Sequence, residues 1–194
     1  MPRLQLTLFV PDEVASVLEP IRQRLERVQH GLIGTHVTLC REDELAKSPL
    51  AVLRGLAQRP TAIALTFGAP VGFDSHGILL PCIDGTTEFH RLRAAVLGST
   101  AIRHQAAHIT LAHPRNPRAP GNTTPHEIAL ATPLRITFAT ISLIEQADGG
   151  PWGVREVVLE SGTQERHPER GGGRARARHA ASWAEPALPL PPPM

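Results

Sequence analysis

The sequence predicts a fold of mixed α-helices and β-strands, made of two similar halves that meet at a cleft. The motif His-x-Thr-Leu occurs twice, at His36 and at His108, each time in a short run of β-branched and aliphatic residues that is typical of a strand. The elements around both copies follow the same order of strand, helix, histidine strand, spacer and strand. A duplicated unit related by an approximate twofold axis would place the two histidines on opposite walls of one cleft.

Within each motif, the histidine and the threonine lie on one face of the predicted strand. Side chains alternate between the two faces of a strand, so His108 and Thr110 point to one side and the aliphatic residues of the motif to the other. His36 and Thr38 have the same spacing. A single motif is explained as well by a strand with a surface histidine, but two copies favour a functional pair.

Length and composition are those of a globular protein. A chain of 194 residues, 41% of them hydrophobic, suits one domain or two small lobes that share a core. It has no apolar run long enough to span a bilayer, and its N-terminus lacks the pattern of a signal peptide. Cys40 and Cys82 each end a predicted strand and suit small buried hydrophobic positions better than a disulfide. We therefore expect a cytoplasmic protein.

The net charge of +2 comes from the C-terminal segment. From residue 162 onward the chain carries five arginines and three glutamates, so the preceding part is neutral overall. A neutral body is not built to bind long nucleic acid through counterion release. We expect a monomer that binds a small or short phosphate-bearing partner, and neither a membrane nor long duplex nucleic acid.

The first half of the chain begins with a strand over residues 3–10, in which polar and apolar residues alternate. A helix follows over residues 13–29, where apolar residues recur at helical spacing. Asp12 is its expected N-cap, and a kink is expected at Pro20. The first histidine strand spans residues 35–39.

Four elements are predicted between the two motifs. Their boundaries come from apolar spacing and from glycine and proline signals. Pro81 marks its strand as an edge strand or as one with a bulge. In order, the elements are a helix over residues 43–58, strands over residues 62–67 and 78–83, and a helix over residues 86–97 closed by Gly98.

The second histidine strand is followed by a long loop, a hairpin and a tail. Residues 113–132 hold four prolines, and such a loop is usually functional or disordered. A long strand is predicted over residues 134–144, with its hairpin partner over residues 152–159. The Gly-, Arg- and Pro-rich segment beyond cannot bury enough apolar surface to fold. We therefore expect a domain over residues 1–161 and a disordered tail over residues 162–194.

Two imidazoles and two hydroxyls that face one cleft suit the cleavage of a phosphodiester. Histidine titrates near neutrality, so one ring can take a proton from the attacking water while the other gives one to the departing oxygen. In-line displacement places these groups on opposite sides of phosphorus. The Thr38 and Thr110 hydroxyls can donate hydrogen bonds to the non-bridging oxygens. This chemistry needs no metal, and the spacing of His104, His108 and His113 does not fit a zinc site well.

The sequence resembles a known family. The paired motifs, Leu8-Phe9-Val10 near the start and the hairpin of Ile141-Ser142-Leu143-Ile144-Glu145 with Trp152 are similar to those of the two-histidine (2H) phosphoesterases, which include the 2′-5′ RNA ligase-like proteins. The resemblance covers roughly residues 3–160. It implies a bilobal α+β fold, with two antiparallel β-sheets and flanking helices around a central cleft, and no cofactor.

The resemblance also implies a function. Members of the family hydrolyse 2′,3′-cyclic phosphates to 2′-phosphates or carry out a related cyclic phosphodiesterase reaction, and some are described as RNA ligases. By position, His36 and His108 would be the catalytic pair, and Thr38 and Thr110 would bind the substrate phosphate. The expected partner is a small cyclic nucleotide or an RNA terminus, with no metal.

A few further residues are candidates for substrate contacts. Arg41 and Arg115 follow the two motifs, and a guanidinium matches phosphate oxygens, although each can instead be a solvated loop charge. Aromatic residues make up only 4% of the chain, and Phe73 and Trp152 are the loop candidates for base stacking, although a structural role suits each of them better. Two other hypotheses remain open: a non-catalytic module that binds a phosphate-bearing ligand, and an interaction protein that works through its tail.

Overall fold

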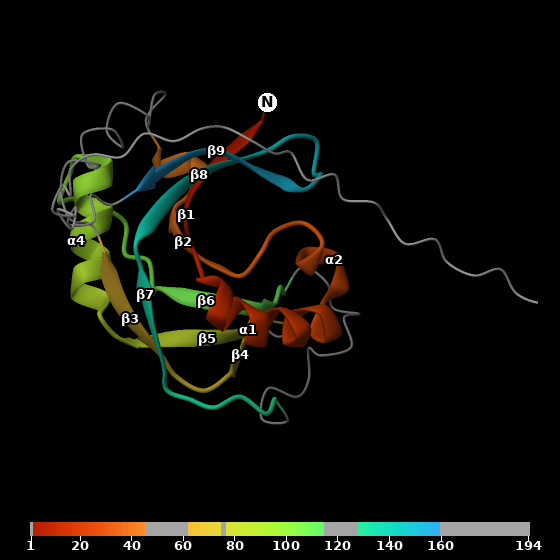
Figure 1. The fold of residues 1–194 in the computed structure, drawn as a ribbon. Helices are drawn as coiled ribbons and strands as arrows, with labels where there is room; N and C mark the ends of the chain where they lie inside the picture. Colours follow the sequence, from red (N-terminus) through yellow and green to blue (C-terminus); the bar gives the residue numbers. More distant parts are fainter. Residues whose placement is uncertain (1, 46–61, 75–76, 115–127, 160–194) are drawn as a thin grey trace, which may run out of the picture. The chain divides into compact units, whose positions relative to one another are not determined.

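The structure is a computed structural model that describes residues 2–45, 62–74, 77–114 and 128–159 (Figure 1). These residues form two antiparallel β-sheets with few helices. The strands are β1 (Arg3–Phe9), β2 (His36–Cys40), β3 (Ile63–Phe67), β4 (Val71–Phe73), β5 (Gly77–Asp84), β6 (His108–Ala112), β7 (Leu134–Phe138), β8 (Thr140–Gln146) and β9 (Trp152–Leu159). The helices are α1 (Asp12–Leu25), α2 (Arg27–His30) and α4 (Thr86–Leu97), with a 3₁₀ helix, η1 (Glu42–Glu44).

The two sheets contain the repeated unit that the motifs predicted. The first sheet has the strand order β2-β1-β8-β9, and the second has the order β4-β5-β3-β7 with β6 paired to β5. In each half, a strand and a helix lead to a histidine strand that pairs antiparallel with the first strand of the unit. His36 lies opposite Phe9, and His108 lies opposite Pro81. The α+β fold with two antiparallel sheets is therefore confirmed.

One strand from each half joins the sheet of the other half. The strand β3 follows β2 in the chain but pairs with β5, whereas β8 follows β6 and β7 but pairs with β1. The predicted single strand over residues 134–144 is therefore wrong. Ala139 separates β7, which pairs with β3, from β8. The alternation of apolar residues changes phase across Ala139, from the even positions up to Phe138 to the odd positions from Ile141. This change of phase was the available signal for the break, but it does not show which strand each part pairs with.

The predicted N-terminal helix is divided in two. The helix α1 begins at Asp12 with Pro11 as its N-cap, so Asp12 lies in the first turn and not at the expected cap. It ends at Leu25, because Glu26 has an extended backbone (φ −152°), and α2 then follows. The Glu26 side chain caps α2 by accepting a hydrogen bond from the N–H of Gln29 at 3.3 Å. Local helical spacing predicted the residues but not this break.

The strand β5 resolves the two alternatives left open for Pro81. It pairs with β3, β4 and β6, so it is not an edge strand. A shift of register between Ile78 and Leu79 shows that the bulge was the right alternative. The helix α4 ends at Leu97, and Gly98 takes the left-handed conformation (φ 63°) at the C-cap, as predicted.

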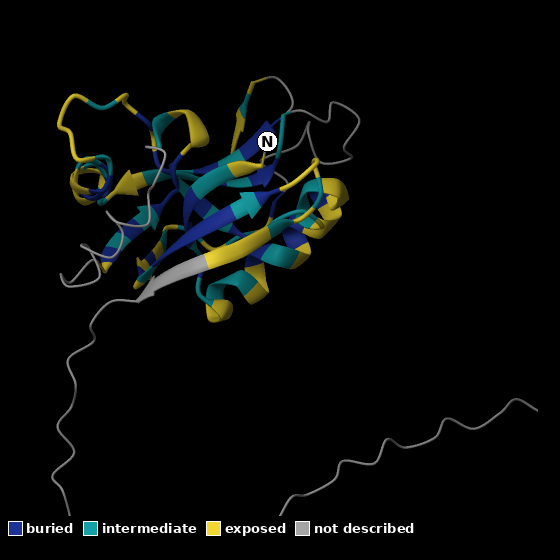
Figure 2. Ribbon diagram, turned by 90° about the horizontal axis from the view of Figure 1, so that it is seen from above, coloured by how far each residue is buried: buried dark blue, intermediate teal, exposed yellow. Residues whose placement is uncertain are grey.

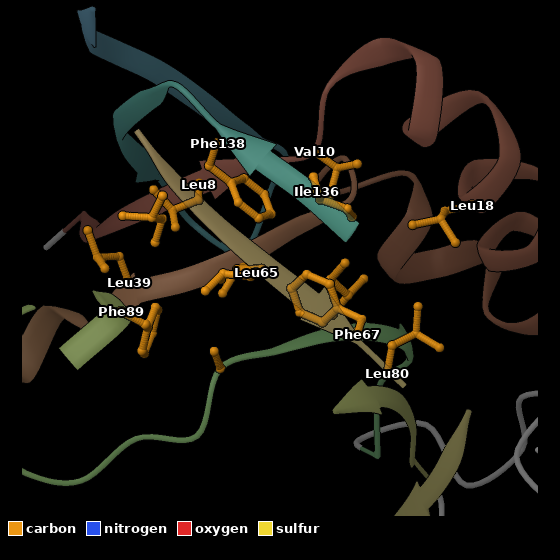
Figure 3. Packing of buried hydrophobic residues seen from close by; sticks show 14 of the residues in the cluster. Leu8, Val10, Leu18, Leu39, Leu65, Phe67, Leu80, Phe89, Ile136 and Phe138 are labelled. Atoms are coloured by element: carbon orange, nitrogen blue, oxygen red, sulfur yellow. The ribbon is translucent and has the colours of Figure 1, made fainter. Parts of the chain in front are cut away.

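The core lies between the sheets and beneath α1 and α4. Figure 3 shows side chains from both sheets and both helices meeting there, with Leu8 and Phe138 on one side and Leu65 and Phe89 on the other. Figure 2 shows that buried residues follow most of the strands, whereas exposed residues lie on the helices, in connecting loops and along part of β9. Cys40 is fully buried in this core, as predicted, whereas Cys82 is half-buried, and both thiols are free. Burial of this apolar surface fixes the histidine strands.

Some predictions fall on residues outside the described ranges. These are most of the helix predicted over residues 43–58, of which η1 is the described part, most of the loop over residues 113–132, and the tail from residue 162. Within the described ranges, no helix has the length and apolar character needed to cross a bilayer.

Candidate active site

Both motif histidines line one groove, although they come from different sheets. His36 begins β2 and His108 begins β6, and these two strands contact each other. Thr38 and Thr110 line the same groove, which has a volume of about 1020 Å³. The apolar residues of both motifs are buried on the opposite face of each strand. The structure thus brings together the four residues that the motif pair singled out.

The two imidazoles are held in the same way. The Nδ1 atom of His36 lies 2.8 Å from the carbonyl oxygen of Gly34, and the Nδ1 atom of His108 lies 2.9 Å from that of Ala106. A carbonyl oxygen can only accept, so Nδ1 carries the hydrogen in both rings. In the neutral ring the lone pair is then on Nε2. Each ring therefore offers Nε2 for proton transfer.

The Thr38 hydroxyl has a partner that the motif does not reveal. The side-chain amide of Gln5 donates hydrogen bonds from Nε2 to Oγ1 of Thr38 at 3.1 Å and to Oγ1 of Thr7 at 2.8 Å. The Thr38 oxygen accepts in this contact, so its own hydrogen remains available for a ligand. Gln5 lies on β1, beside β2, and lines the groove. Its place on the polar face of the first predicted strand was the available signal for this contact.

The surroundings of His36 disfavour its charged form. The pKa of His36 is lowered to about 4, mainly by burial and also by the charges of Arg22 and His108, although the Gly34 carbonyl and Glu19 act in the opposite direction. The imidazole is therefore neutral at pH 7 before a substrate binds. A phosphate anion beside the ring would raise this pKa, because a nearby negative charge stabilises the imidazolium.

Arg22, a buried residue of α1, lines the groove and forms an ion pair with the half-buried Glu19. Its Nη1 atom donates to Glu19 at 2.7 Å, and its Nη2 atom donates to the carbonyl of Ile33 at 2.8 Å. Glu19 also accepts a hydrogen bond from the hydroxyl of Thr35 at 2.8 Å. The pair thus fixes the loop that enters β2, directly before His36. Sequence reasoning missed this contact, because Arg22 and Thr35 lie on different elements.

A second buried arginine joins the two histidine strands. Arg93, on α4, is fully buried and donates to the carbonyl of Leu39, to Glu44 at 2.6 Å and to the side chain of Gln105 at 3.0 Å. The Gln105 amide in turn donates to the carbonyl of Thr38 at 2.8 Å. These contacts connect β2 to the segment that enters β6. The one sequence signal was an arginine on the apolar stripe of the predicted helix.

The accessory residues predicted from the sequence have different outcomes. Arg41 is exposed and lines the groove, whereas Arg115 lies outside the described residues. Phe73 and Trp152 both line the groove. The Phe73 ring lies 6.3 Å from the His108 ring, measured between centroids, so it adjoins one of the two imidazoles. In the described ranges, no three His, Cys, Asp or Glu side chains form a cluster that could hold a metal ion.

Solved structures share this fold at low sequence identity. Escherichia coli LigT complexed with ATP matches with a TM-score of 0.53 and 16% identity, over 82% of this chain and 99% of that chain. LigT complexed with NADP⁺ matches with a TM-score of 0.52 and 16% identity, over 81% of this chain and 96% of that chain. A structure described as a phosphoesterase matches with a TM-score of 0.50 and 14% identity, over 82% and 99% of the two chains.

Comparison of sequences alone does not detect this similarity. It matches no protein-family model and none of the curated proteins searched. The similarity to solved structures nevertheless covers nearly the whole length of each of them. This chain therefore has the fold of LigT.

Proposed function

We propose that this protein is a phosphoesterase that hydrolyses 2′,3′-cyclic phosphates, at RNA ends or in small cyclic nucleotides, to 2′-phosphates. His36 and His108 are the general acid–base pair. The observation that carries the proposal is their arrangement in one groove, with Nδ1 of both rings held by a backbone carbonyl. The tautomer leaves both Nε2 atoms for proton transfer, so the two rings supply the acid and the base without a metal ion.

The reaction follows from in-line attack on phosphorus. One imidazole takes a proton from water at Nε2 as the water oxygen forms its bond to phosphorus. The bond from phosphorus to O3′ breaks on the opposite side, and the other imidazole, as imidazolium, gives its Nε2 proton to O3′. The product is a 2′-phosphate with a free 3′-hydroxyl, and proton exchange with solvent restores the pair.

Threonine hydroxyls and arginine side chains stabilise the negative charge that develops on the phosphoryl oxygens. Thr38 and Thr110 lie two residues beyond the histidines on the same faces, where they can donate to the non-bridging oxygens. Arg41 lines the groove and adds a positive charge for the phosphate. We also propose Arg115 as a phosphate contact, on the sequence position alone.

The comparisons agree with a nucleotide substrate. The solved structures with this fold include LigT complexed with NADP⁺, with ATP and with 3′-AMP, each of which carries a phosphate on a nucleoside. A groove of about 1020 Å³ in this chain is large enough for such a molecule. The neutral body predicted from the sequence also favours a short substrate over long duplex nucleic acid.

The test is hydrolysis of nucleoside 2′,3′-cyclic phosphates in the presence of EDTA. We expect turnover by the wild-type protein and a loss of about 10²–10⁴-fold in kcat for His36→Ala and for His108→Ala, as is typical of a general acid or base. Circular dichroism of both variants controls for folding. Full activity in either variant, or loss of wild-type activity on chelation, contradicts the proposal.

Two alternatives use the same site: RNA ligation, and binding of a phosphate-bearing ligand without catalysis. If a 5′-hydroxyl of RNA replaces the attacking water, the product is a 2′-5′ phosphodiester, and the assay with added 5′-hydroxyl RNA detects this ligase activity. A non-catalytic module would bind 2′-AMP in a histidine-dependent way and hydrolyse no cyclic phosphate. Binding and turnover measured on the same variants separate these alternatives.

A further inference from the structure

An aromatic and cationic wall lies in the groove beyond the histidines. The guanidinium carbon of Arg3 lies 5.5 Å from the centroid of the Trp152 ring, at the distance of a cation–π contact. Both side chains line the same groove as His36 and His108. Trp152 is half-buried and Arg3 is exposed, so part of this wall is open to a ligand.

The pairing of the strands places this wall on the groove face of the first sheet. Arg3 pairs with Gln146 across β1 and β8, and Gln146 pairs with Trp152 across β8 and β9, so the three residues form one row. Along β1, Arg3 is on the same face as Gln5, which contacts Thr38. The row and the threonine that we propose as a phosphate ligand therefore share one face of the sheet.

Several hydrogen bonds hold the wall in place. Arg3 donates to Glu42 at 3.2 Å and to Oε1 of Gln146 at 3.3 Å. The Nε2 atom of Gln146 donates to the carbonyl of Gly150 at 2.8 Å. The backbone N–H of Trp152 donates to the carbonyl of Leu32 at 2.8 Å. Gln146 is buried and hydrogen-bonded within the protein at both Oε1 and Nε2, so it holds Arg3 and the turn before Trp152 in place.

The groove is large enough for a ligand that is bigger than a phosphate ion. Small-molecule pockets commonly have volumes of about 300–1,000 Å³. A volume of about 1020 Å³ therefore leaves room beside the histidines for the nucleoside that carries the phosphate. Nucleobases stack on aromatic side chains and on guanidinium planes.

We propose that Trp152 and Arg3 form a nucleobase-binding subsite, which holds the base of the substrate while the histidines act on its cyclic phosphate. The inference rests on the proposed function and extends it to the nucleobase, the part of the substrate that does not react. The wall offers flat faces, and its amide partner Gln146 is buried and hydrogen-bonded within the protein at both Oε1 and Nε2. The subsite therefore accepts all four bases, because stacking needs only a π-face.

The test compares a substrate that has a base with one that has none. For nucleoside 2′,3′-cyclic phosphates, Trp152→Leu raises KM by roughly tenfold or more with little change in kcat, as expected from the loss of one stacked base. For glycerol 1,2-cyclic phosphate, which has no base, Trp152→Leu leaves both constants unchanged. Trp152→Phe, which keeps an aromatic face, restores most of the affinity for the nucleoside substrates.

The matched control is the second tryptophan of the chain, Trp183. Trp183→Leu leaves the kinetics of both substrates unchanged and makes Trp152 the single tryptophan fluorophore. In that background, addition of 2′-AMP quenches the Trp152 emission, whereas glycerol 2-phosphate does not. Equal loss on both substrates in Trp152→Leu, or equal response to both phosphates, overturns the subsite.

The two proposals fail in different ways. If no cyclic phosphate is hydrolysed, the proposed function is wrong, and the fluorescence experiment still decides whether Trp152 binds a base. If both substrates are hydrolysed with equal efficiency and Trp152→Leu changes neither, the phosphoesterase function stands and the subsite is wrong.

Discussion

His36 and His108 occupy equivalent places in two separate strand pairs, and each donates its Nδ1–H to the carbonyl two residues earlier in the chain, at 2.8 Å and 2.9 Å. The two rings therefore share one tautomer and offer the same atom, Nε2. What distinguishes them is their surroundings. A phenylalanine ring lies 6.3 Å from each imidazole, Phe9 from His36 and Phe73 from His108, so the aromatic neighbours are alike. The difference is one of charge, because the positive charge of Arg22 acts on His36. The motif supplies two equal proton carriers, and the rest of the fold makes them unequal.

The pKa of His36 gives a first prediction. We expect its imidazole to titrate near pH 4 in the ligand-free protein, mainly because it is buried, and NMR of the ring protons measures this directly. The unfolded chain binds this proton near pH 6.5, so between about pH 6.5 and pH 4 it holds one more proton than the folded state. Stability must therefore fall as the pH falls through this window. His36→Asn removes this part of the slope, and an unchanged slope contradicts the assignment.

A second prediction concerns Arg22. Its charge lowers the pKa of His36, so Arg22→Gln should raise that pKa, whereas Arg22→Lys, which keeps the charge, should leave it near the wild-type value. NMR titration of His36 in the two variants makes the comparison. An equal shift in both variants would mean that packing, and not charge, links Arg22 to His36.

A third prediction concerns the hydroxyl of Thr38. If this group donates to the phosphoryl oxygen in the transition state, Thr38→Val lowers kcat by about 10²-fold, with a smaller effect on KM. Thr38→Ser keeps the hydroxyl and should lose much less. Gln5→Leu removes the amide that contacts Thr38 and should lower kcat less than Thr38→Val, with an unchanged pH profile. A kcat in Thr38→Val equal to that of the wild-type protein excludes this role.

A fourth prediction compares two neighbouring carboxylates. Glu44 pairs with the buried Arg93, with side chains 9% and 0% exposed, whereas Asp43 pairs with the exposed Arg103. Glu44→Gln leaves a buried guanidinium without its counter-charge and should cost about 3 kcal/mol of unfolding free energy. Asp43→Asn is the matched control and should change stability little, because solvent screens exposed pairs. Urea denaturation measures both variants, and equal losses would contradict the difference in burial.

Local patterns predicted much of this fold. The alternation of side chains placed His36 with Thr38 and His108 with Thr110 on one face each, and the structure places all four in the groove. The strand over residues 152–159 has the predicted boundaries. These features depend on the twofold period of a strand, just as the end of α4 depends on the ability of Gly98 to adopt a positive φ. Both are properties of a few consecutive residues.

The local patterns did not predict the contacts between elements that are distant in the sequence. Arg93 reads as an arginine on a helix, yet it is fully buried and connects β2 with the segment before β6. Gln5 contacts Thr38 from the neighbouring strand, and Ala139 marks the change from one sheet to the other. A periodic pattern shows which face of a segment is apolar, but it does not show which other segment covers that face.

The sequence by itself determined that the chain carries two histidine–threonine strands, because the alternation of side chains is a local rule that the motif satisfies twice. Only the tertiary structure decided that these strands come from different sheets, line one groove and place His36 near Arg22. The partner of each strand is set by the burial of apolar surface over the whole chain, and no short segment contains that information.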